Sequence, residues 1–213
     1  MPTQSRLWVA FIATVVTGLV VIGWLQVGQP APVAQNTSSI SLAAPKETTG
    51  APLSAPVPEP EDYRHDDYRK PVPTTPKGAT VLNAPQALEL WSQKNAIFID
   101  VYPRPPKPPN LPAGTLWRDP SHQTIEHAKW LPNVGYGVLS AEVDSYFRRN
   151  LTALTSRDLS KPIVFFCLRD CWMSWNSAKR AMAYGYNNVL WFPDGTDAWQ
   201  EIGQLVVDVQ PEK

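Results

Sequence analysis

The sequence predicts an α/β domain with a mostly parallel central sheet, preceded by a transmembrane segment and a disordered linker. Two patterns predict the domain: apolar runs typical of buried strands, and segments of helical periodicity that alternate with them. An uncharged apolar run near the N-terminus and a concentration of proline after it predict the other two parts. We place the anchor at 1–27, the linker at 28–77 and the domain at 78–213.

The N-terminal run, residues 7–25, carries no charge and follows Arg6. It is nearly as long as the roughly 20 residues that cross a bilayer as a helix. Signal-peptide cores are shorter, about 7–15 residues, so we interpret the run as an uncleaved signal anchor, with a cleaved signal peptide as the alternative. In both cases the positive end stays in the cytoplasm. We therefore expect a protein anchored in the inner membrane with its domain in the periplasm.

The linker, residues 28–77, mixes proline with alanine, serine and threonine. Such a composition buries too little apolar surface to offset the entropy lost on ordering. Its charged and aromatic part, 59–69, is expected to be solvated, with a docking segment as the alternative.

The domain is expected to begin near Gly78 with a short strand at 80–82. A helix follows, with Ala87, Leu88, Leu90 and Trp91 at helical spacing. The continuous apolar run at 96–101 suits a strand that is covered on both faces. A long proline-rich loop, 103–120, comes next.

The second half repeats this alternation. We predict a helix over 139–154, with Val143, Phe147 and Leu151 on one face, and a buried strand over 162–166. Further elements are a helix over 174–184 that ends at Gly185, a last strand over 188–192 and a short helix that begins near 194. In the helix over 174–184, Trp175 is expected in the core and Lys179-Arg180 on a solvated face.

Charge argues against one class of partner. The chain has 19 lysines and arginines against 19 aspartates and glutamates, and no basic block. Phosphate binding needs clustered cations, so we expect no nucleic acid partner.

Only two cysteines occur, Cys167 and Cys171, in the predicted strand-to-helix loop. Backbone N–H groups and the helix dipole converge at such a loop, and both stabilise a thiolate. In an oxidising periplasm the pair can close into a disulfide. Arg169 would lower the pKa of a neighbouring thiol and Asp170 would raise it. The other candidate site residues are Leu168, Trp172, Met173 and Ser174.

From Thr80 onward the order of motifs resembles the rhodanese fold. The resemblance lies in the strand that ends at Cys167 and in 99–101 (Ile-Asp-Val), 185–189 (Gly-Tyr-x-x-Val) and 195–199 (Gly-x-x-Ala-Trp). It implies a three-layer sandwich with a catalytic cysteine. The chain departs from the family at Leu168 and Tyr102, where rhodaneses have arginine, and in the absence of glycine from 167–174. We expect a longer loop for that reason.

The pattern Cys-x-x-x-Cys-Trp at 167–172 is similar to a narrower family, the pyrroloquinoline-quinone (PQQ)-dependent catabolism-associated CXXCW-motif proteins. That resemblance implies a periplasmic accessory to quinoprotein alcohol oxidation, with a quinoprotein dehydrogenase system as the partner.

Three functions of the cysteines stay open. The first is thiol–disulfide redox or sulfur transfer, for which we prefer Cys167 as nucleophile and Cys171 as resolving thiol, with the reverse as the alternative. The second is Cu(I) binding by both thiolates and Met173, with a third ligand such as His122 or His127. The third is a structural disulfide or a partner-docking module, in which Trp172 and Trp175 present a surface. Reactivity requires that the two sulfurs face each other and that neither is sealed inside the hydrophobic interior.

Overall fold

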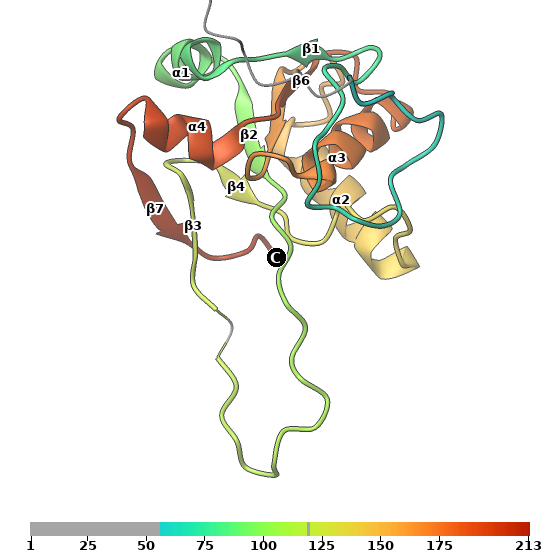
Figure 1. Ribbon diagram of the computed structural model, residues 1–213, viewed down its shortest axis with the longest axis vertical. Coiled ribbons are helices and arrows are strands. Elements are labelled where there is room, and N and C mark those ends of the chain that lie inside the picture. Colours follow the sequence, from blue (N-terminus) through green and yellow to red (C-terminus); the bar gives the residue numbers. More distant parts are fainter. Residues whose placement is uncertain (1–55, 119) are drawn as a thin grey trace, which may run out of the picture. The chain divides into compact units, whose positions relative to one another are not determined.

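The computed structural model describes residues 56–118 and 120–213, which belong to one compact unit (Figure 1). The predicted anchor, 1–27, and the first half of the predicted linker lie outside the described residues. Within the described ranges, no helix combines the length and the apolar character needed to span a membrane.

The central sheet has five strands in the order β1-β6-β5-β2-β4, and every neighbouring pair is parallel. This confirms the predicted α/β fold with a mostly parallel sheet. The strands are β1 (Thr80–Val81), β2 (Ile97–Asp100), β4 (Lys129–Trp130), β5 (Ile163–Phe166) and β6 (Val189–Phe192). Their carboxyl ends gather at one edge of the sheet, where Cys167 follows β5.

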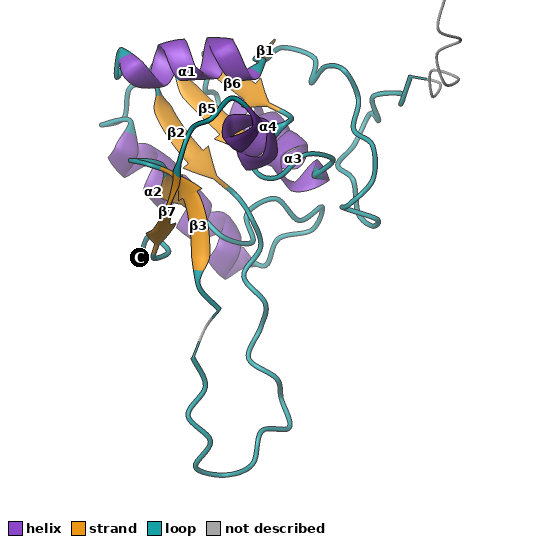
Figure 2. Ribbon diagram, turned by 60° about the vertical axis from the view of Figure 1, so that its left-hand side comes forward, coloured by secondary structure: helices purple, strands orange, loops and turns teal. Residues whose placement is uncertain are grey.

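Helices cover both faces of the sheet (Figure 2). Side chains along a strand alternate between faces. Ile163 and Phe165 of β5 join a core with α2 (Ala141–Leu154) and α3 (Trp172–Ala183). Val164 and Phe166 join a second core with α1 (Ala84–Ser92) and α4 (Gly195–Glu201). The molecule therefore has three layers.

Local signals set the helix ends. Asn83 and Gln86 form a reciprocal capping box at α1, with hydrogen bonds of 3.0 Å in both directions. Gly185 follows α3 at φ 98°, as its position after the helix predicted. At its other end α3 starts at Trp172, two residues before the predicted start, so Trp172 and Met173 are helical.

Three strands were not predicted. One is the short β4, and the other two are β3 (His122–Ile125) and β7 (Val206–Val209), which pair antiparallel in a sheet of their own. The predicted loop over 103–120 has no helix or strand in its described residues, and it projects from the body of the domain in both views.

Residues 56–77, here called the strap, correct the expectation of a solvated linker. The strap lies against α3 in Figure 1. The backbone N–H of Trp172 donates to the carbonyl of Tyr68 at 2.9 Å, and the indole N–H of Trp175 donates to the carbonyl of Thr75 at 3.1 Å. The strap orders despite its prolines because α3 offers it donors and an apolar surface.

The Lys179-Arg180 pair, which we expected on a solvated face, helps to hold the strap. The Nζ atom of Lys179 donates to the backbone carbonyls of three strap residues, Pro60, Glu61 and Asp62. Arg180 is only 5% exposed. Its guanidinium donates to the carbonyls of Val134, Tyr136 and Gly137, and it lies 4.1 Å from the centroid of the Tyr63 ring.

Asn176 is fully buried and exchanges two hydrogen bonds with the backbone of Arg64, while its amide also donates to the carbonyl of Gly135. We expect Asn176→Ala to free the strap and to lower the free energy of unfolding by about 1–3 kcal/mol, because buried backbone groups lose their partners. Limited trypsin cleavage after Arg64 and Arg69, together with urea unfolding, measures both effects.

The matched control is Asn188→Ala, because Asn188 is exposed and its amide makes one hydrogen bond, to Ser160. Equal cleavage of the two variants would contradict the role assigned to Asn176.

Candidate redox site

The two cysteines meet at the carboxyl edge of the sheet. Cys167 directly follows β5, and Cys171 is the N-cap residue of α3. They form a disulfide, with their Cα atoms 6.2 Å apart. The sulfur atoms therefore face each other, as the redox interpretation requires. The loop is not extended as expected, because α3 begins immediately after Cys171.

Both cysteines are sealed from solvent, each with 1% exposure, inside the core between the sheet and α3. Cys167 continues the alternation of β5, so its side chain shares a core with those of Ile163 and Phe165. The second condition for reactivity is therefore not met in this closed structure, because both sulfurs lie in the hydrophobic interior. A thiol of another protein cannot reach either sulfur while the structure is closed.

The backbone on the other side of Cys167 is held by α4. The N–H of Thr196 donates to the carbonyl of Cys167 at 3.0 Å, and Leu168 forms a β-bridge with Gly195. Gly195 has φ 49°, and a Cβ atom there would lie 1.9 Å from the Cys167 oxygen. Only glycine fits this approach, which explains the Gly-x-x-Ala-Trp motif physically.

Arg169 does not act as the predicted cation beside the sulfurs. Its guanidinium donates to both carboxylate oxygens of Glu201, at 2.7 and 2.6 Å, and to Asp194 at 3.3 Å. These hydrogen bonds raise the pKa of Arg169, and the same pairing lowers the pKa of Glu201. Its backbone N–H donates to Asp197, so Arg169 holds the loop between the two cysteines against α4. Asp170, which we expected to oppose a thiolate, is exposed at φ 54°.

The other predicted site residues lie in the first turn of α3, and all are buried. Met173 is 1% exposed and belongs to the core. The Ser174 hydroxyl donates to the carbonyl of Cys171 and accepts from the indole N–H of Trp191. Trp172 is 2% exposed, and its indole N–H is a buried donor with no hydrogen-bond partner in the described residues.

Trp172 also lies beside the strap. Its ring lies 5.3 Å from the Arg64 guanidinium carbon, and with residues 57–60 and 63–66 it lines a hollow of about 440 Å³. The strap and Trp172 therefore cover the amino end of α3 together, and we refer to them as the cover.

Sequence reasoning missed one polar cluster near this edge. Asp100, at the end of β2, is 1% exposed and accepts from the Thr124 hydroxyl at 2.6 Å and from the Tyr102 N–H at 2.8 Å. The Nε2 atom of His122 lies 2.8 Å from Asp100, and its ring stacks on that of Tyr102. The available signal was Asp100 itself, a charged residue inside the apolar run 96–101. Within the described ranges, no group of three or more histidine, cysteine or carboxylate side chains is placed to hold a metal.

No family model and no curated protein matches this chain. One similar solved structure is the polysulfide-sulfur transferase homodimer from Wolinella succinogenes, with 18% identity, 62% of this chain and 81% of that chain covered, and a TM-score of 0.38. Two structures of EanB with hercynine share 20% identity over 56% of this chain and 25% of EanB, with a TM-score of 0.34. At this level of similarity, neither the fold nor the function of the chain follows from these structures.

Gly195 offers a test of the close approach to Cys167. We expect Gly195→Ala to lower the free energy of unfolding by about 3 kcal/mol or more, because a strained φ and a backbone clash add together. Gly203→Ala is the control: Gly203 also has a positive φ of 81°, but nothing lies within 4 Å of an added Cβ. It should cost only about 1 kcal/mol. Equal losses in denaturant unfolding would show that the contact at Cys167 is unimportant.

Proposed function

We propose that this chain is a rhodanese-like protein whose Cys167–Cys171 pair carries out thiol–disulfide redox chemistry coupled to sulfur handling. The observation that carries the proposal is the disulfide itself, formed between the residue that ends β5 and the residue that caps α3. The order of the strands and the placement of the first cysteine support the rhodanese-like assignment.

The chemistry has three balanced steps. A dithiol reduces the disulfide by two electrons and is itself oxidised to a disulfide, which leaves two thiols on the chain. The thiolate of Cys167 then takes the terminal sulfur of a polysulfide, which leaves one sulfur shorter, and becomes a persulfide. The thiolate of Cys171 attacks the Sγ of Cys167, closes the disulfide and releases hydrosulfide.

The amino end of α3 supports this assignment of roles. Cys171 is the N-cap residue, and no side chain caps the helix there. A Cys171 thiolate would therefore face the positive end of the helix dipole, which favours the anion that closes the disulfide. Arg169 supplies no such support, because carboxylates neutralise it.

Burial sets the condition under which this chemistry runs. Since both cysteines are 1% exposed, a reductant or sulfur donor reaches them only when the cover over α3 moves. We place that movement in the strap, because it is irregular backbone held to α3 by hydrogen bonds, and Val57, Tyr68 and Val72, which pack against the core, are only partly buried.

Location and partner complete the proposal. The apolar run at 7–25 supports an inner-membrane anchor, with the domain in the periplasm. The Cys-x-x-x-Cys-Trp pattern supports an accessory role in PQQ-dependent alcohol oxidation, beside a quinoprotein dehydrogenase. Copper binding is not proposed, because the two sulfurs are bonded to each other and no described cluster supplies the further ligands.

Mass spectrometry of single cysteine variants tests the roles. After reduction and exposure to sodium polysulfide, we expect full-length Cys171→Ser to gain one sulfur at Cys167, because the resolving thiol is missing. Wild type should return to the disulfide, two hydrogens lighter, and release sulfide. Cys167→Ser is the matched control and should gain no sulfur. A folded Cys171→Ser chain, checked by circular dichroism, that stays unmodified would refute the nucleophile assignment.

The strap can be tested by the rate at which dithiothreitol reduces the disulfide. We expect Asn176→Ala to be reduced about ten-fold or more faster than wild type, because about 1.4 kcal/mol of lost holding energy is ten-fold in the open population. Thiol labelling at fixed times measures the rate. If Asn176→Ala and the exposed control Asn188→Ala react equally fast, the strap does not control access.

A further inference from the structure

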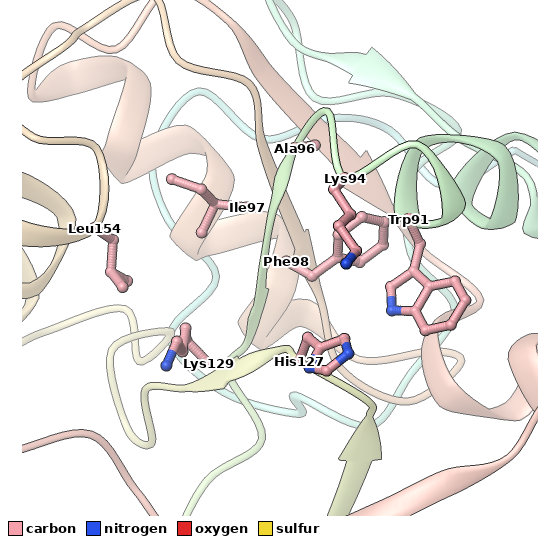
Figure 3. Close-up of a pocket in the computed structure, with 8 residues that line it drawn as sticks. All are labelled: Trp91, Lys94, Ala96, Ile97, Phe98, His127, Lys129 and Leu154. Atoms are coloured by element: carbon pink, nitrogen blue, oxygen red, sulfur yellow. The ribbon is translucent and has the colours of Figure 1, made fainter.

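A second hollow lies at the opposite end of β2 from the disulfide. This hollow, of about 390 Å³, is lined by residues of α1, β2, β4 and α2, of the loop between α1 and β2, and of the segment before β4 (Figure 3). Since β2 and β5 are parallel and Cys167 follows the carboxyl end of β5, this hollow lies at the amino end of the sheet. It is independent of the cysteines.

The edge of β2 is open at this hollow. Its pairing with β5 covers all four residues from Ile97 to Asp100, but its pairing with β4 begins only at Ile99. The N–H groups of Ile97 and Val101 donate toward β5, whereas the carbonyl of Asp100 accepts from Leu131 on the other side. Backbone directions alternate along a strand, so the N–H of Phe98 points to the edge that has no partner strand among the described residues.

Both faces of this open edge are apolar. Ile97 and Leu154 both pack against the core on the α2 face. Phe98 belongs to the other core, against which Trp91 packs. Figure 3 shows Ile97 and Leu154 on one side of the strand and Trp91 on the other. A small flat molecule fills one face only. An extended peptide paired with β2 places successive side chains on both faces, which matches the shape of the hollow.

The rim of the hollow is cationic. Lys94 and Lys129 line it together with His127, whose Nε2 atom lies 3.8 Å from the Glu126 carboxylate, and none of the lining residues is itself acidic. Lys129 also pairs with Glu212 at 3.0 Å. Lys94 is exposed and has φ 54°, a backbone conformation of higher energy for lysine than for glycine. An occupant with carboxylates on either side of an apolar pair would complement both the walls and the rim.

We propose that this hollow, formed by the open edge of β2, docks an extended acidic segment of a partner protein, which adds a strand beside Ile97 and Phe98. Backbone hydrogen bonds at the edge supply affinity, and the apolar walls and the two lysines supply selectivity. Lysines at a strand edge can also serve only to prevent aggregation. If that were their only role here, the acidic segment would not bind.

The probe is the peptide Ac-Glu-Glu-Val-Ile-Val-Glu-Glu-NH2, titrated into the ¹⁵N-labelled full-length chain and followed by NMR. We expect saturable binding, a shift of the Phe98 amide resonance and slower hydrogen exchange at that amide. Methylation of the central peptide nitrogen should weaken binding about three- to ten-fold, because one backbone hydrogen bond is lost.

Charge reversal tests the rim. The double variant Lys94→Glu, Lys129→Glu should bind the peptide about ten-fold more weakly, with the loss reduced at high salt. Lys70→Glu, Lys107→Glu is the matched control, because neither residue lines the hollow. Absence of saturable binding would overturn the proposal, as would binding that ignores both methylation and charge reversal. Resonance shifts confined to the cysteine loop would also overturn it.

Discussion

The placement of the disulfide depends on one close backbone approach, between Gly195 and Cys167. Thr196 donates to the carbonyl of Cys167, and no side chain fits between the two segments. This contact fixes where β5 ends, and therefore which way the Cys167 side chain points. With its carbonyl directed to α4, the sulfur is directed to α3 and reaches Cys171 at the first turn of that helix.

The same helix organises the irregular segments around it. Asn176 and, one turn later, Lys179 and Arg180 of α3 donate hydrogen bonds to backbone carbonyls of the strap and of residues 134–137. Irregular backbone carries polar groups that water would otherwise satisfy. By supplying those donors, α3 lets a proline-rich segment order without pairing in a sheet, and lets it cover the amino end where Cys171 lies.

Periodicity was a good guide to the central sheet and its helices. Long apolar runs such as 96–101 and 162–166 marked β2 and β5 because strands covered on both faces have no polar alternation. β3 was missed because three of its four residues, 122–124, are polar, and β7 was missed because its only partner, β3, lies more than 80 residues away. The order of the strap was missed for a related reason. Its composition predicts disorder for the segment in isolation, but not for the segment packed beside α3.

The candidate site was also only partly predictable from the sequence. The proximity of Cys167 and Cys171 followed from their spacing in a strand-to-helix loop. The role of Arg169 did not, because Glu201 lies 32 residues further along the chain. Burial of the pair also could not be inferred, since it depends on how β5 and α3 pack together in three dimensions.

Burial and reactivity are compatible if the covered state is only modestly favoured. Trp172 has a buried indole N–H with no partner in the described structure, and such a donor costs about 1–3 kcal/mol. This cost opposes the hydrogen bonds that hold the strap, so the closed state is less stable than its contacts alone imply. If opening costs about 3 kcal/mol, exchange at the disulfide slows by about two orders of magnitude yet still proceeds. The strap then protects the pair from indiscriminate thiols, and a partner that binds the open strap, or satisfies the indole N–H of Trp172, gains access by shifting that balance.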